Sequence, residues 1–503
     1  GDLSSAFSHY KKALTLDPIL KLAWNNILFP MRIMTSQNRV SEEPLHSLKN
    51  ELGASQFVNE QLGLLKYKIH LGTSAAEVYF NEAIDLISQG SKLSIANPDP
   101  GTGEHKGSIT LQEDIIALQH FGRSGTGLLH SLLDGHSELS NLPSIYFSEY
   151  FDSVTWERIC AGGWEEMVDR FIATYPVLFD ASASDPVPTI SGATITNLGR
   201  KEGLCNVGDN GEEVLQLDKA VFRSELCSLT EYYSSLDALT FFKLVHFAYE
   251  KTLGRTGEKS KIFYHIHNPD TYARLNFFRS APNARWILMV REPIQSCESW
   301  LRRSFDFKDY TKTTSRICSM LLAIDDVIFT EQSSIGVRLE DLKKHPEKTI
   351  GALCDWMGIK EEKSLYEMTM QGKKWWGDPT SPNFERHRDP FDKDSIDNKV
   401  GSIFSKNDQF ILKTLFHPFS VRFGYVKENS KQFEEDLQAI RPMLDQMFDF
   451  EKKLAKDTGV EPQQFMKSGS YQYLRCGLID RWRVLNEFKT YPNMIKPLEI
   501  VRV

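Results

Sequence analysis

The chain has 503 residues, of which 41% are hydrophobic and 25% charged, and its formal net charge is −8. This is the composition of a globular protein that is too long for one ordinary hydrophobic core, so we expect two or three domains. The negative charge argues against a broad nucleic-acid-binding surface but is compatible with a local basic pocket. No apolar run reaches the roughly 20 residues that a membrane-spanning helix needs.

Seven cysteines are scattered along the chain and form no Cys-x-x-Cys pair. Their odd number and spacing argue against a dense disulfide framework and give no zinc signature. The chain begins at Gly1 without an initiator methionine or a signal peptide, which is typical of a fragment. The cellular location is therefore left open: a cytoplasmic protein is favoured, and a lumenal one stays open if the chain is a fragment.

The first hundred residues carry a helical pattern. Ala6, Tyr10 and Ala13 share one face of a helix that Pro18 ends, and Trp24 follows. The same small–aromatic–small spacing returns about 70 residues later, close to two periods of about 34 residues. The pattern resembles tetratricopeptide repeats, with an ordinary amphipathic helical bundle as the alternative. We expect residues 1–100 to form this helical domain, truncated at its N-terminus, and to bind a protein partner or a second copy of the chain.

A segment rich in Pro, Gly and Asn at residues 96–103 indicates a linker. Beyond it, short apolar runs alternate with helical stretches, which predicts an α/β domain with a parallel sheet and flanking helices over residues 112–426. The chain then becomes charged and helical again, notably over 432–456, and we expect residues 427–503 to form a C-terminal helical extension. The predicted strands are Ile115–Phe121, Lys261–Ile266, Trp286–Val290 and Ile335–Leu339.

The first predicted strand leads directly into a glycine-rich loop, and a leucine-rich helix follows. A strand, a glycine turn and a helix together point free backbone N–H groups at an anion. Two hydroxyls and one guanidinium in the loop add further donors. The loop is not a Walker A loop, because its spacing is too short and the lysine is missing; a plain strand-to-helix turn is the alternative. The loop residues are Gly122, Arg123, Ser124, Gly125, Thr126 and Gly127.

This loop resembles the 5′-phosphosulfate-binding loop of the sulfotransferases that use 3′-phosphoadenosine 5′-phosphosulfate (PAPS). In that family Lys or Arg precedes Ser-Gly-Thr after a strand, and the tyrosylprotein branch uses Arg, as Arg123 does here. The segment 134–138 (DGHSE) is similar to the family's D-x-H-P-E/D ending of the next helix, with Ser137 in place of proline. The resemblance covers about residues 112–426 and implies a P-loop-like three-layer fold.

A second motif lies at the end of a later predicted strand. Arg291 ends this strand and Ser299 follows eight residues later, which matches the Arg and Ser that hold the donor's 3′-phosphate in the family. Arginine suits this role because its planar fork can bind phosphate oxygens with two hydrogen bonds. The alternative is a surface arginine with an unrelated serine.

Three further segments are similar to the family. The segment 338–342 (RLEDL) resembles its R-x-E-D-L stretch, for which we expect a structural role. Lys399 and Ser402 lie in a segment that resembles the loop folded over the nucleotide, so the resemblance implies that both contact the donor. Phe423-Gly424-Tyr425 resembles the end of these domains. Trp375 and Trp376 are alternatives for a stacking surface or for ordinary packing.

The base that takes the acceptor's proton has three candidates. The tyrosylprotein and heparan branches place a Glu after the first helix, and Glu149 follows it here, although several residues later. His265 and His267 end a strand 26 and 24 residues before Arg291, and the small-molecule branch has its catalytic His about two residues nearer. Glu149 and His267 rank level, with His265 behind. A His-x-His pair could also bind a metal, but no third ligand has a recognisable spacing, so we expect no metal.

The resemblance implies in-line transfer of sulfonate from PAPS to a hydroxyl or amine, with PAP, the desulfonated donor, as product. Arg123 would stabilise charge on the leaving phosphate. The alternatives are a nucleotide-dependent P-loop kinase and a repeat scaffold with a non-catalytic nucleotide-binding domain. The acceptor stays unknown: a protein, peptide or glycan is favoured over a small molecule.

Overall fold

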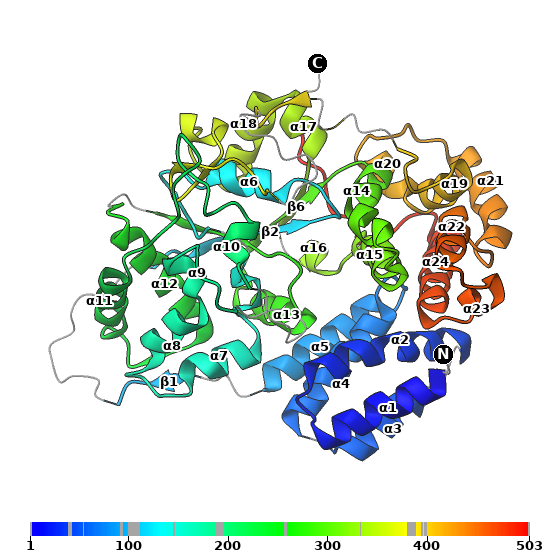
Figure 1. Ribbon diagram of the computed structural model, residues 1–503, viewed down its shortest axis with the longest axis horizontal. Coiled ribbons are helices and arrows are strands. Elements are labelled where there is room, and N and C mark those ends of the chain that lie inside the picture. Colours follow the sequence, from blue (N-terminus) through cyan, green and yellow to red (C-terminus); the bar gives the residue numbers. More distant parts are fainter. Residues whose placement is uncertain are drawn as a thin grey trace.

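The computed structural model contains a central parallel sheet with helices on both faces, preceded and followed by helical segments (Figure 1). The strand order is β3-β5-β2-β6-β7, and every neighbouring pair is parallel. The structure describes residues 3–38, 43–53, 55–90, 94–98, 111–143, 146–186, 196–255, 259–331, 333–379, 389–393, 396 and 400–500.

The parallel α/β fold predicted from the sequence is confirmed. Each of the four predicted strands agrees with a strand of the sheet to within one residue at either end. The fifth strand was missed, because three residues are too few to show an alternating pattern. The strands are β2 (Asp114–His120), β3 (Leu139–Asn141), β5 (Lys261–His265), β6 (Arg285–Val290) and β7 (Ser334–Arg338).

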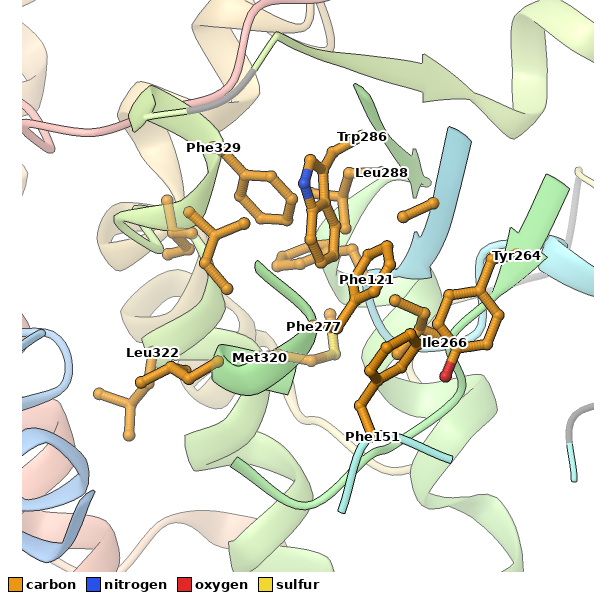
Figure 2. Close-up of a cluster of buried hydrophobic side chains, with 14 of the residues drawn as sticks. Phe121, Phe151, Tyr264, Ile266, Phe277, Trp286, Leu288, Met320, Leu322 and Phe329 are labelled. Carbon is orange, nitrogen blue, oxygen red and sulfur yellow. The ribbon is translucent and has the colours of Figure 1, made fainter. Parts of the chain in front are cut away.

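Alternating side chains of the strands enter two separate cores. Ile116 and Leu118 of β2 pack under α6 (Thr126–Leu133), α17 (Leu339–Lys344) and α18 (Pro346–Met357). Ile115 and Ala117 face the opposite core, where Trp286 and Leu288 of β6 meet Phe277, Met320 and Phe329 (Figure 2). The helices of this second layer include α12 (Ala238–Thr252), α13 (Thr271–Ser280), α14 (Pro293–Asp306), α15 (Tyr310–Ala323) and α16 (Ile328–Glu331).

Short elements fill the long connections of the α/β domain. Between β3 and β5 lie η1 (Tyr146–Glu149), α7 (Ser153–Cys160), α8 (Met167–Thr174), α9 (Pro176–Phe179), α10 (Leu198–Lys201) and α11 (Lys219–Thr230). Two small antiparallel sheets pair β1 (Ile95–Ala96) with β4 (Ser235–Leu236), and β8 (Thr369–Met370) with β9 (Lys373–Lys374). After α18 come η2 (Lys363–Tyr366), α19 (Lys406–Leu415) and α20 (His417–Arg422).

The N-terminal segment is helical, as predicted. Ala6, Tyr10 and Ala13 all lie on the first helix, which ends at Leu16, before Pro18. Its identity as a set of tetratricopeptide repeats stays a prediction. The helices are α1 (Leu3–Leu16), α2 (Lys21–Asn38), α3 (Glu43–Leu52), α4 (Gln56–His70) and α5 (Ala76–Gln89).

The C-terminal segment is also helical, as predicted, and the stretch 432–456 is divided between two helices. A 3₁₀ turn, η4 (Arg441–Met443), interrupts it at Pro442, which cannot continue the helical hydrogen bonds. The last described residues return to the sheet: Gly336 of β7 donates to Lys496 O (2.7 Å) and accepts from Leu498 N (2.8 Å). This pairing covers the β7 edge of the sheet. The helices are α21 (Ser430–Ile440), α22 (Asp449–Thr458), α23 (Pro462–Met466) and α24 (Gly469–Phe488).

Buried ion pairs join the N- and C-terminal segments to the α/β domain. Arg32 of α2 contacts Asp480 of α24 at 3.2 Å, and Arg481 contacts Asp325, which follows α15, at 2.9 Å. The next residue, Asp326, accepts from Tyr67 of α4 (3.3 Å) and from Arg274 of α13 (2.5 Å). The three segments thus meet at a cluster of buried charged residues around Asp325 and Asp326, which we call the seam. The boundaries 1–100, 112–426 and 427–503 stay predictions.

Within the part of the chain that the structure describes, no helix is long and apolar enough to cross a membrane.

Candidate functional site

The glycine-rich loop makes a tight turn between β2 and α6. Gly122 and Gly125 have φ values of +62° and +85°, in the left-handed region that favours glycine. Ser124 Oγ accepts the Phe121 N–H (3.2 Å), and Ser296 of α14 donates to Phe121 O (2.8 Å). These contacts fix the loop so that the first N–H groups of α6, which have no intrahelical partner, point outward at the end of the sheet.

Gly122→Ala is expected to lower the free energy of unfolding by roughly 2–4 kcal/mol, from the left-handed φ and a disturbed buried hydrogen bond. The added methyl would overlap Ser296 Oγ and lie 2.8 Å from Met320 Sδ. Urea unfolding of the variant measures the change. Gly127→Ala is the matched control, because its methyl meets only Trp375 at 3.6 Å within a helix. Equal effects of the two substitutions would contradict this account of the turn.

A cavity of about 910 Å³ opens at the carboxyl ends of β2, β5 and β6. All six predicted loop residues line it, together with His265, His267, Arg291 and Ser299. The structure therefore brings together most of the predicted site residues, from three separate parts of the sequence. Glu149 and Ser402 are not among the lining residues, and Lys399 lies outside the described residues.

Arg291 is 4% exposed and directly follows β6, and Ser299 lies almost two turns into α14. Burial lowers the pKa of Arg291, and the positive charge of Arg123 adds to that effect, while Glu340 opposes it. Two arginines that repel each other across one cavity form a positive field, which favours a ligand with more than one anionic group.

The segment around Ser402 is bound to α14. Glu298 is 3% exposed, and its carboxylate accepts the N–H groups of Gly401 (3.1 Å) and Phe404 (2.8 Å) and the Ser402 hydroxyl (3.0 Å). The resemblance to the family implied that the Ser402 hydroxyl contacts the donor; in the structure this hydroxyl contacts Glu298. Because Glu298 precedes Ser299, this anchor holds the segment next to the cavity. Sequence spacing gave no indication of the Glu298 contacts.

Histidines form one wall of the cavity. The rings of His120 and His267 are 4.8 Å apart, and His265 lies 5.9 Å from His267 and 5.0 Å from His130. Asn268 connects the first two: its Oδ1 lies 2.9 Å from His120 Nε2, and its Nδ2 lies 3.2 Å from His267 Nε2. The amide thus holds His267 against the loop strand.

Burial lowers the pKa of His267 to about 3, with smaller contributions from His120 and Arg123. The pKa of His265 is also lowered by burial, and neither of its ring nitrogens has a hydrogen-bond partner among the described residues. Both rings are therefore neutral at pH 7 and have a lone pair that can accept a proton.

Glu149 lies at the end of η1, away from the cavity lining. It is 4% exposed, and its Oε1 accepts the Asp270 N–H at 3.0 Å. Burial, together with the charges of Asp270 and Asp152, raises the pKa of Glu149 to about 8. Lys21 of α2 binds Asp152 and lies 3.8 Å from Asp270, which links the N-terminal helices to this acidic cluster.

The free energy of unfolding of Glu149→Gln, relative to that of the wild type, is expected to rise by roughly 2–4 kcal/mol between pH 5 and pH 8. In the folded protein Glu149 keeps its proton up to about pH 8, whereas its usual pKa is 4.5. The folded state thus binds the extra proton, so wild-type stability falls as the pH rises through this window, while glutamine does not titrate. Urea unfolding of both proteins at pH 5 and pH 8 measures the change. A difference that is the same at both pH values would contradict the raised pKa.

Several lining residues were not predicted from the sequence. Arg302 and Arg303 follow Ser299 by three and four residues on α14, so helical spacing could have indicated them. No pattern in the sequence indicated that Arg316, His120 or Trp300 would line the cavity. The lining also includes Met368, Met370 and Phe307. Trp375 and Trp376, left open above, line the cavity, and their indole N–H groups donate to Glu202 O (2.9 Å) and Gly208 O (2.8 Å).

Over the described ranges, the structure contains no cluster of three or more His, Cys, Asp or Glu side chains that could hold a metal ion.

These features define a three-layer α/β domain with a glycine-rich loop and an arginine-lined cavity at the carboxyl ends of its strands. Residues 121–363 match the model of the sulfotransferase family. This part of the chain is therefore similar to the sulfotransferase family, and the match includes the loop, both histidines, Arg291 and Ser299.

The solved structures that are similar to this chain include two sulfotransferase domains. One is the sulfotransferase domain from the Synechococcus PCC 7002 olefin synthase, with 14% identity and a TM-score of 0.34, covering 63% of this chain and 98% of that domain. The other is the sulfotransferase domain from the curacin biosynthetic pathway, with 14% identity and a TM-score of 0.27, covering 69% of this chain and 97% of that domain. A search of curated proteins gave no match.

Proposed function

We propose that this protein transfers a sulfonate group from PAPS to a hydroxyl or amine acceptor. The observation that carries the proposal is one cavity lined by the β2–α6 loop, by Arg291 with Ser299, and by His267. PAPS has anionic groups at its 5′ and 3′ ends, and these residues supply two separate groups of hydrogen-bond donors that can bind anions. The loop and Arg123 would bind the 5′-phosphosulfate, and Arg291 and Ser299 the 3′-phosphate.

In this mechanism the acceptor oxygen attacks the sulfur in line with the bond to the 5′-phosphate. The new S–O bond forms as the bond between sulfur and the phosphate oxygen breaks, and PAP leaves. Arg123 and the N–H groups at the start of α6 stabilise the charge on the leaving phosphate. His267 takes the acceptor's proton, because it lines the cavity and is neutral at pH 7. His265 and Glu149 remain the other candidates for this base.

Thermal unfolding with added nucleotide tests the proposal. A ligand that binds only the folded state raises its stability by about 2.7 kcal/mol at 100 times its Kd. PAP is expected to stabilise the protein more than adenosine 5′-phosphate, which lacks the 3′-phosphate, and Arg291→Met is expected to remove this difference. No stabilisation by saturating PAP would refute the proposal, and stronger stabilisation by ATP would favour a kinase.

A further inference from the structure

The cavity carries more positive charge than the proposed donor sites use. Among the described residues, five arginines line it: Arg123, Arg291, Arg302, Arg303 and Arg316. The donor sites use Arg123 and Arg291. Arg302 lies near the proposed 3′-phosphate site. Its Nη2 is 3.4 Å from the hydroxyl of Ser402, and the segment that contains Ser402 is anchored beside Ser299. Arg303 and Arg316 remain without a role in donor binding.

Arg316 is linked to the proposed base through Trp300 and His120. Its Nη1 donates to Trp300 O (2.5 Å), and its guanidinium lies 5.4 Å from the Trp300 ring centroid. The Trp300 ring meets His120 edge to face at 5.6 Å, and His120 lies 4.8 Å from His267. A continuous row of side chains therefore connects Arg316 to the proposed base.

Arg303 extends the same charged surface. It follows Ser299 by one turn of α14, and its guanidinium lies 5.9 Å from the ring of Phe307. Phe307 also lines the cavity and is 74% exposed. An exposed aromatic ring beside a cation offers a surface on which an organic acceptor can lie.

Within the described ranges, neither of these two arginines forms an ion pair with a carboxylate. Four carboxylates also line the cavity: Glu202, Asp306, Asp378 and Asp389. Burial lowers the pKa of Arg316, the charges of Arg123 and Arg303 lower it further, and Asp309 opposes them. An anionic ligand group would remove this repulsion and form charge-assisted hydrogen bonds.

We propose that the acceptor carries an anionic group, a carboxylate or sulfate, near the hydroxyl that receives the sulfonate, and that Arg303 and Arg316 bind this group. The inference rests on the proposed function. The inference specifies an acceptor that carries an acidic group, and both acidic phenols and acidic sugars meet this description.

Binding of matched ligand pairs to the PAP-saturated protein tests the inference by calorimetry. One pair is 3-(4-hydroxyphenyl)propanoate and its amide; the other is phenyl glucuronide and phenyl glucoside. At least one acid is expected to bind about 10-fold tighter than its neutral partner, as expected for one charge-assisted hydrogen bond. Arg303→Gln and Arg316→Gln should each reduce this ratio several-fold. Lys431→Gln, an exposed charge on the C-terminal helices with a side chain 91% exposed, should not.

The outcomes separate the two proposals. The pair that shows the preference identifies an acidic phenol or an acidic sugar as the acceptor class. Equal binding of acids and neutral partners, or no binding of any probe to the PAP-saturated wild type, would overturn the acidic acceptor and leave sulfonate transfer intact. Weaker PAP binding in both Arg variants without a charge preference would assign these arginines to the donor. Arg303 is exposed, so its variant keeps the test valid if Arg316→Gln fails to fold.

Discussion

His267→Gln is expected to lower the turnover of sulfonate transfer by about 10²–10⁴-fold, the range typical of a lost general base. PAP should still stabilise the variant, because the loop and Arg291 are unchanged. Turnover with saturating donor and PAP-dependent melting, measured on the same protein, separate these two effects.

The position of His267 explains why the effect should be large. Its ring lines the cavity that also contains the loop, and Asn268 holds it beside His120. A pKa of about 3 would make it a weak base in the free protein, but Arg123 is one cause of that low value. Burial is the largest cause, and an anionic donor bound to Arg123 would remove only the smaller contribution of that charge and so raise the pKa of His267 above its value in the free protein. Activity should therefore fall as the pH drops through that raised pKa.

Two substitutions control for this prediction. Glu149→Gln should keep turnover within a few-fold of the wild type, because Glu149 contacts Asp270 outside the cavity lining. His265→Gln should have an intermediate effect, since His265 packs between His130 and His267. Turnover of His267→Gln within a few-fold of the wild type would exclude it as the base.

The sequence predicts the parts of the site that are local in the chain. The strand before Gly122 and the strand before Arg291 are buried apolar runs, and the residues after them must meet at the carboxyl end of a parallel sheet. This is why the loop, Arg291, Ser299 and the two histidines line one cavity. Periodicity and turn chemistry suffice for the strands and the loop, because both act over a few residues, whereas Arg291, Ser299 and the two histidines were selected by the resemblance to the family.

Features that depend on tertiary packing could not be predicted in this way. Arg316 reaches the cavity only because α15 packs along α14, and the Ser402 hydroxyl is taken by Glu298, more than a hundred residues earlier. Glu149 and His267 ranked level in sequence, yet only His267 lines the cavity. Short-range patterns contain no information about which of two distant polar residues faces a shared space.

The seam between the three segments is also invisible in sequence. Arg32, Arg481 and Asp325 sit in separate helical or loop stretches, where a charged residue normally indicates a solvent-facing position. In the structure all three are buried. The N- and C-terminal segments therefore complete the core of the α/β domain at Asp325 and Asp326, and loss of this contact should destabilise the whole chain.

Arg481→Met is expected to lower the free energy of unfolding by about 3–5 kcal/mol, the cost of leaving one buried charge without its partner. Arg481 is fully buried, contacts Asp325 at 2.9 Å and lies 3.9 Å from the ring centroid of Tyr491. Methionine keeps part of the apolar volume but removes the positive charge. Urea unfolding at pH 7 measures the change.

The remaining Asp325 makes the prediction pH-dependent. Burial raises the pKa of Asp325 even though Arg481 opposes the shift, so removing Arg481 should raise it further. In the variant the folded state then binds a proton that the unfolded state has released, and stability falls as the pH rises through this window. The loss in free energy of unfolding caused by Arg481→Met should therefore be smaller at pH 5 than at pH 7.

Arg483→Met is the matched control for this charge loss. Arg483 lies two residues away on the same helix, its side chain is 39% exposed, and it contacts Asp480 at 3.3 Å. Asp480 is buried but keeps Arg32 as a partner, and an ion pair made by an exposed arginine contributes about 0–1 kcal/mol, so the control should stay within that range. The double variant Arg481→Met/Asp325→Leu should recover part of the lost stability, because no unpaired charge remains in the seam. If Arg481→Met cost no more than Arg483→Met, the buried pair would not hold the three segments together.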